Sequence, residues 1–179
     1  MDTPVIKITK EMIESAKRKE KKVEVNRDKN SKVDTIVGIL GEYVFAQYFY
    51  GDWQNNNVGK NKGKSDFKNI EVKTSAFPYN KNLNLIVREE YAKKRQPPFY
   101  IQIIIDIKSK NVSEIEAKTN CYICGYAKHN EVINAPLKDF GAKDGSSGGY
   151  RSYYIPIKNL HPMKEFKKMY NKYQINNRH

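Results

Sequence analysis

The strongest secondary-structure signal in the chain is the run FYIQIIIDI over residues 99–107. It is rich in β-branched residues and almost continuously apolar, which is typical of a central strand buried on both faces of its sheet. Segments with helical and with strand periodicity alternate along the rest of the chain. We therefore predict an α/β fold, with a mixed β-sheet flanked by helices.

A chain of 179 residues fits a single domain spanning residues 1–179. Helical periodicity over residues 9–25 and 163–173 predicts two terminal helices that extend the core. A shorter helix is predicted over residues 89–95, ended by Pro97-Pro98. No apolar run approaches the length of a membrane span and no secretory signal opens the chain. We therefore expect a cytoplasmic protein without a membrane partner, and the sequence leaves open a cellular, viral or mobile-element origin.

The two cysteines, Cys121 and Cys124, have the C-x2-C spacing that raises the question of a zinc site. A structural zinc site needs four well-spaced ligands, and the chain lacks a second cysteine pair. The surrounding sequence CYICGYA is better interpreted as a buried strand, in which a free cysteine behaves as a small apolar residue.

The segment DFKNIEVK, residues 66–73, combines a turn signal with alternating apolar and polar side chains. A two-residue turn at 68–69 would place Asp66 opposite Glu71, with Cβ atoms about 4.5–5.5 Å apart. Lys73 would then point to the same side as Glu71. Two carboxylates and an ammonium group around a divalent cation are typical of phosphodiester hydrolysis. The alternative is a surface hairpin with a solvated ion pair.

A second candidate residue lies in the stretch TIVGILGEYVFAQYFY, residues 35–50. Its apolar residues predict a helix that is buried nearly all round, and Glu42 is the only charged residue in it. A buried carboxylate is costly unless it is paired or protonated. Glu42 could bond a lysine, an arginine or backbone amides, but we favour a role at a metal site. Gly38 and Gly41 would allow the helix to pack closely on a sheet.

These residues have a familiar order. Gly41-Glu42 in an apolar helix, Ser65-Asp66, and then Glu71-Val72-Lys73 together resemble the PD-(D/E)XK nuclease superfamily. That superfamily includes restriction endonucleases, Holliday-junction resolvases and many phage nucleases. The resemblance covers residues from about 33 to 107, and Ser65 stands where the family name has proline. It implies a restriction-endonuclease-like fold with an αβββαβ core, whose first strand would lie near residues 53–58.

The resemblance also implies a role for each residue of the motif. Asp66 and Glu71 would bind Mg2+, with Mn2+ as a substitute, and the backbone carbonyl of Val72 is a candidate third ligand. Glu42 would complete the metal site, directly or through a water molecule. Lys73 would position or activate the attacking water. We favour an electrostatic role for Lys73 because the neighbouring carboxylates stabilise its charged form.

The formal charge of +13 favours a polyanionic partner, of which nucleic acid is the usual one. The abundance of Lys, Asn, Ile and Tyr is also what an AT-rich gene encodes, so part of this charge could serve solubility alone. The candidate DNA contacts are basic residues just before Asp66 and in the Gly- and Ser-rich loop 141–152: Lys60, Lys62, Lys64, Lys143 and Arg151.

The sequence therefore predicts a Mg2+-dependent DNA endonuclease, with Glu42, Asp66, Glu71 and Lys73 as its catalytic residues. A homodimer would fit double-strand cleavage, which usually needs two active sites. Three alternatives stay open. The chain could be a nucleic-acid-binding module with the same fold but no turnover, an RNA-directed or exonucleolytic nuclease, or an interaction protein for an acidic partner.

Overall fold

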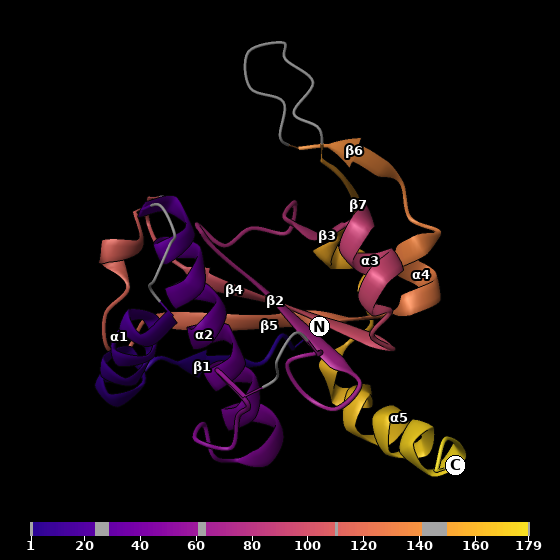
Figure 1. Ribbon diagram of the computed structural model, residues 1–179, viewed down its shortest axis with the longest axis horizontal. Coiled ribbons are helices and arrows are strands. Elements are labelled where there is room, and N and C mark those ends of the chain that lie inside the picture. The colour runs from indigo at the N-terminus through magenta and orange to yellow at the C-terminus, as the bar shows by residue number, and fades with distance from the viewer. Residues whose placement is uncertain (1, 24–28, 61–63, 110, 141–149, 179) are drawn as a thin grey trace.

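The main sheet has four strands in the order β1-β5-β4-β2 (Figure 1). The computed structural model describes residues 2–23, 29–60, 64–109, 111–140 and 150–178. Strands β2 and β4 are parallel, whereas β4 pairs with β5 and β5 with β1 in antiparallel fashion. The strand bounds are Val5–Lys7 for β1, Ile70–Phe77 for β2, Phe99–Asp106 for β4 and Asn120–Lys128 for β5.

The predicted central strand is confirmed, because every residue of β4 except the last is buried. Alternate residues of β4 enter two different hydrophobic clusters, with Ile101 and Ile103 in one and Tyr100 in the other. A strand buried on both faces explains the nearly continuous apolar run in the sequence. The predicted strand around the two cysteines is also confirmed, and Cys121 and Cys124 are free thiols in β5.

The larger cluster lies between the main sheet and the helices that pack on one of its faces. The long helix α2 crosses β2, and α1 packs against α2 (Figure 1). The cluster also includes Phe166 and Tyr170 of α5. These helices span Lys10–Val23 for α1, Lys29–Tyr50 for α2 and Met163–Asn176 for α5.

The second cluster lies between the main sheet and a layer built from a smaller sheet and two short helices. The smaller sheet has the order β3-β7-β6, and its strands are antiparallel. Its strands are Asn84–Arg88 for β3, Leu137–Asp139 for β6 and Arg151–Pro156 for β7, and the helices are Glu89–Arg95 for α3 and His129–Ile133 for α4. Two 3-10 turns, Val112–Glu114 and Ile157–Asn159, complete the described elements. The mixed α/β arrangement is as predicted.

The two terminal helices agree with prediction in position. The predicted helix 9–25 is seen as α1, and the Thr9 hydroxyl caps it by accepting the Met12 N–H at 3.2 Å. The predicted helix 163–173 continues to Asn176. Among the described residues no helix is both long and apolar enough to cross a membrane.

The strand order around α2 differs from the αβββαβ expectation. Between α2 and α3 the described residues form two strands, β2 and β3, and β3 belongs to the smaller sheet. A further strand was expected near residues 53–58, which instead form turns. Side chains there bond the backbone locally: Asp52 accepts the Gln54 N–H at 2.9 Å and Asn56 accepts the Val58 N–H at 3.1 Å. Such bonds favour turns over a strand ladder.

Candidate active site

The segment before β2 forms the predicted hairpin. Phe67 and Ile70 exchange both backbone hydrogen bonds, at 3.0 and 3.1 Å, around the two-residue turn Lys68-Asn69. Of the two turn residues only Asn69 has a positive φ, at +64°, which is the pattern of a type II turn and a conformation that asparagine tolerates. The Tyr170 hydroxyl of α5 donates to the Lys68 carbonyl at 2.8 Å, so the turn is fixed to the domain.

Asp66 lies at the open edge of β2, where the main sheet ends. Its Oδ2 atom accepts the backbone N–H of Val72 at 2.8 Å, and the Asn57 side-chain amide donates to its carbonyl at 3.2 Å. The N–H and C=O groups of a strand residue point toward the same edge. The Val72 carbonyl therefore faces the edge at which Asp66 lies, as a ligand role would require.

Gly41 brings helix α2 onto β2. A Cβ atom at this position would lie 1.7 Å from the Thr74 Oγ1 atom, so only glycine permits the observed approach. The predicted close packing is thus confirmed for Gly41, whereas a Cβ at Gly38 would meet nothing within 4 Å. The next residue, Glu42, is carried to the same edge of β2.

The Glu42 carboxyl is hydrogen-bonded to the carboxyl of Asp66. Burial, followed by repulsion from Asp66 and Glu71, raises the pKa of Glu42 from 4.5 to about 9, and the nearby Lys19 offsets only part of this rise. Glu42 therefore holds a proton at neutral pH and donates it to Asp66. Its Oε2 atom is buried and has no hydrogen-bond partner within the described part of the chain.

Asp66 is affected by the same environment. Burial and then repulsion from Glu71 raise the pKa of Asp66 to about 7, although the Val72 N–H, Lys73 and Arg95 each act in the opposite direction. Glu42 and Asp66 are thus a coupled pair that shares a proton and would gain a negative charge near neutral pH.

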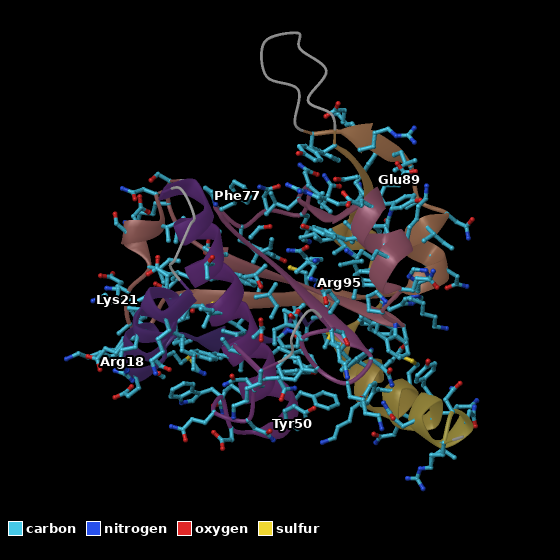
Figure 2. The ribbon with its side chains drawn as sticks, in the orientation of Figure 1. Arg18, Lys21, Tyr50, Phe77, Glu89 and Arg95 are labelled. Carbon is cyan, nitrogen blue, oxygen red and sulfur yellow. The ribbon has the colours of Figure 1, made fainter. Side chains whose placement is uncertain are left out.

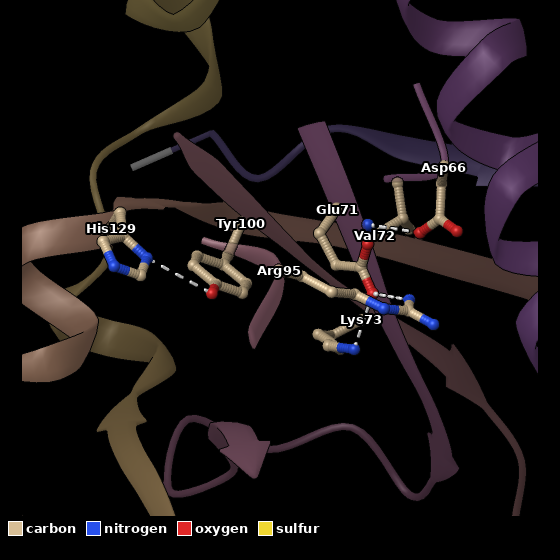
Figure 3. A network of polar contacts seen from close by, with 7 residues as sticks. All are labelled: Asp66, Glu71, Val72, Lys73, Arg95, Tyr100 and His129. Carbon is tan, nitrogen blue, oxygen red and sulfur yellow. Dashed lines mark hydrogen bonds and ion pairs between the residues drawn. The ribbon is translucent and has the colours of Figure 1, made fainter. Parts of the chain in front are cut away.

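Glu71 is the most deeply buried of the three acids, with 5% of its surface exposed. Its Oε1 atom lies 2.9 Å from the Lys73 Nζ atom and 3.5 Å from the Arg95 Nη1 atom (Figure 3). Its Oε2 atom is also buried, and no described residue hydrogen-bonds it. Tyr100 is the β4 neighbour of Glu71, and burial together with Glu71 raises the pKa of the Tyr100 hydroxyl. This hydroxyl lies 3.5 Å from His129 Nδ1.

Arg95 is a member of the site that sequence reasoning missed. It is the last residue of α3, and Figure 2 shows it near the centre of the molecule, while Arg18 and Lys21 lie on the outer side of α1. The connection from β2 to the parallel strand β4 runs through β3 and α3, so the end of α3 returns to the beginning of β2. The helix itself was predicted, but its contact with Glu71 depends on the parallel pairing.

The donor set at this edge consists of oxygen atoms, which suits a hard cation such as Mg2+ or Mn2+. Two carboxyl oxygens without a hydrogen-bond partner among the described residues, Oε2 of Glu42 and Oε2 of Glu71, fit such an ion, because a buried acceptor is costly unless it is satisfied. In the arrangement that the described residues adopt, however, no three Asp, Glu, His or Cys side chains form a metal-holding group. One ion held by all three carboxylates stays a prediction.

The candidate DNA contacts are placed in part. Lys60 and Lys64 are exposed in the segment before Asp66. Arg151 begins β7 and forms an ion pair with Glu89, with 3.0 Å between Nη2 and Oε2, while 61% of its side chain stays exposed. The other two candidates lie outside the described residues: Lys62 and Lys143.

The chain was compared with protein-family models, with curated proteins and with solved structures, and none of the three comparisons gave a match.

Proposed function

We propose that this protein is a metal-dependent nuclease that hydrolyses DNA phosphodiester bonds, with a restriction-endonuclease-like core. The observation that carries the proposal is the convergence of three acids at the open edge of β2. Glu42 comes from a helix, Asp66 from a hairpin and Glu71 from the strand, and repulsion from Glu71 contributes to the raised pKa values of both Glu42 and Asp66. Titratable groups that perturb each other in this way concentrate at functional sites.

The three carboxylates, with the Val72 carbonyl as a further ligand, would hold a Mg2+ ion that polarises a phosphoryl oxygen and lowers the pKa of a water at the site. The Lys73 ammonium group, 2.9 Å from Glu71, would orient the attacking water and stabilise the negative charge that develops during attack. The Arg95 guanidinium, on the same Glu71 oxygen, would bind a non-bridging phosphate oxygen.

The proton shared by Glu42 and Asp66 gives the site a pH dependence. A carboxyl group must lose its proton to bind a cation, so ion binding would release protons near neutral pH. The pKa values of about 9 for Glu42 and about 7 for Asp66 mean that the cation and the proton compete for these carboxyl groups between pH 7 and 9. Cleavage should therefore increase with pH through this range.

The test is cleavage of supercoiled, linear, branched and single-stranded DNA in Mg2+, Mn2+, Ca2+ or chelator. We expect Glu71→Gln and Lys73→Met each to reduce the cleavage rate by about 100-fold or more. Glu14→Gln is a matched control, because Glu14 is an exposed acid on α1 that is paired with Lys10. Wild-type rates in Lys73→Met, or cleavage that persists in chelator, would refute the proposal. Parallel RNA substrates and end-labelled DNA test the RNA-directed and exonucleolytic alternatives.

A DNA-binding module without turnover is the second candidate, and one observation favours it. Glu71 is already compensated by Lys73 and Arg95, and Glu42 by its hydrogen bond to Asp66, so the site is largely neutralised by protein groups. Tight, salt-dependent DNA binding without cleavage in any of the divalent metals would support this candidate over the nuclease.

A further inference from the structure

A cleft of about 660 Å3 begins at Lys73 and extends over the smaller sheet. Its wall combines cations with large apolar side chains from β3, α3 and the chain on either side of residues 141–149: Lys73, Ile86, Arg88, Tyr91, Phe140 and Tyr150. Four of these are unusually exposed for their size, at 40% for Ile86, 41% for Tyr91 and Phe140, and 55% for Tyr150. Exposed apolar side chains that gather at one place indicate a binding surface.

Aromatic rings and guanidinium groups alternate along this cleft. The Arg88 guanidinium lies 4.7 Å from the ring centre of Tyr150 and 5.7 Å from that of Tyr91. Arg95 lies 5.5 Å from the Tyr91 ring and 3.5 Å from the carboxylate of Glu71. A continuous series of rings and cations therefore joins the cleft to the candidate active site.

We propose that this cleft binds unstacked bases of a single-stranded stretch of nucleic acid, adjacent to the phosphate that is cut. Nucleic-acid bases stack on tyrosine rings and on guanidinium planes, while cations hold the phosphates between them. In a duplex the base faces are hidden by stacking on their neighbours, so these rings have nothing to contact. The proposal rests on the proposed function in placing the scissile phosphate at Lys73.

The charge of the cleft supports this occupant. Its described lining has no acidic side chain, and of its two cations Lys73 is paired with Glu71, whereas Arg88 has no ion pair among the described residues, so an anionic ligand is favoured beside Arg88. Phosphate contacts alone would not explain the exposed rings, and an apolar partner alone would not explain the cations beside them. A strand of nucleic acid with accessible bases satisfies both.

The experiment measures equilibrium binding in chelator, so that no cleavage occurs, with three fluorescent probes of equal length. These are a single strand, the same sequence as a duplex, and the same single strand with abasic sites in its central nucleotides. Each stacked base contributes about 1–3 kcal/mol, which corresponds to roughly 5- to 150-fold in the dissociation constant. We expect the normal single strand to bind tighter than both other probes by a factor in this range.

Substitutions in the cleft separate stacking from charge. Tyr150→Leu and Tyr91→Leu should weaken binding of the normal single strand by roughly 5-fold or more and leave the abasic strand unaffected, whereas Tyr150→Phe should retain the affinity. Arg88→Gln should reduce the slope of log affinity against log salt by about 0.7, the value for one phosphate contact on a single strand. Lys10→Gln on α1, on the other side of the molecule from α3 in Figure 1, is the control for charge alone.

The outcomes distinguish this inference from the nuclease itself. Equal affinity for the normal and abasic strands, or full affinity in Tyr150→Leu, overturns base stacking in the cleft even if the wild-type protein cuts DNA. A preserved preference for the normal single strand, without cleavage in any metal, supports the cleft and overturns the proposed function. Thermal unfolding of each variant verifies that it is folded.

Discussion

Replacing Glu42 with glutamine should stabilise the protein, and the stabilisation should grow with pH. Glutamine keeps the shape of a protonated glutamate and can still donate a hydrogen bond to Asp66. In the folded protein the pKa of Glu42 is raised from 4.5 to about 9, first by burial and then by repulsion from the neighbouring acids. The folded chain therefore keeps a proton that the unfolded chain releases, and stability falls as pH rises from about 4.5 to 9.

The size of the effect follows from the proton linkage. At about pH 7.5 the unfolded chain gains roughly 1.36 kcal/mol for each pH unit above 4.5 by ionising Glu42, or on the order of 4 kcal/mol, which the folded chain does not gain. Part of this difference is lost to solvent screening, because Glu42 is only part-buried. We expect Glu42→Gln to increase the free energy of unfolding by about 2–4 kcal/mol at this pH. That corresponds to roughly 5–15 °C in Tm.

The assay is thermal and urea unfolding of the wild-type and Glu42→Gln proteins in chelator, at intervals from about pH 4.5 to 9. The two curves should coincide near pH 4.5 and diverge steadily above it. Glu14→Gln makes the same chemical replacement at an exposed acid that is paired with Lys10 and should follow the wild type. Adding Mg2+ should raise the Tm of the wild type more at pH 8.5 than at pH 6, because the ion competes with the proton, and should stabilise Glu42→Gln much less.

The reasoning would be refuted if Glu42→Gln destabilised the protein in chelator at pH 7.5, or if the difference from wild type did not depend on pH. Either result would mean that Glu42 is charged and paired in the folded protein. A pH-dependent stabilisation without any effect of Mg2+ would leave the proton linkage intact and contradict only the metal site.

Three further predictions concern packing and charge around the site. Gly41→Ala should lower the free energy of unfolding by about 2 kcal/mol or more, because its Cβ would lie 1.7 Å from Thr74 Oγ1. Gly38→Ala should raise the free energy of unfolding by up to about 1 kcal/mol, because a Cβ there meets nothing within 4 Å. Urea unfolding measures both changes. Arg95→Met should slow DNA cleavage by about 100-fold with little loss of stability, and an unchanged rate constant would remove this residue from the site. Tyr170→Phe should cost about 1 kcal/mol by removing the hydrogen bond to the hairpin turn, and equal denaturation midpoints for the two proteins would contradict this.

Several elements could be predicted because their signals are local. The turn at Lys68-Asn69 and the alternation of side chains in β2 depend on neighbouring residues, and both are found. The same is true of α3, whose observed bounds Glu89–Arg95 match the predicted helix that ends before Pro97-Pro98. Hydrogen bonds and side-chain periodicity within a few residues are sufficient to specify such elements.

Other features could not be predicted because they depend on which distant segments pair. The prediction of an extra strand near residues 53–58 was wrong, because asparagine and aspartate side chains there accept backbone N–H groups that a strand would offer to a neighbouring strand. The short strands β1 and β6, with three residues each, carry too little periodicity to be recognised. The contact of Arg95 with Glu71 follows from the parallel pairing of β2 with β4, which local sequence does not specify.

The sequence by itself determined the class of the fold, the helix that carries Glu42, and the side of β2 on which Glu71 and Lys73 lie. The tertiary structure decided that Glu42 meets Asp66, that Arg95 joins Glu71, and that a cleft of rings and cations begins at Lys73. The physical reason is the separation along the chain over which each kind of interaction acts. Periodicity and turn chemistry act over a few residues, whereas the proton shared between two buried acids depends on burial and on charges that only the packed chain brings together.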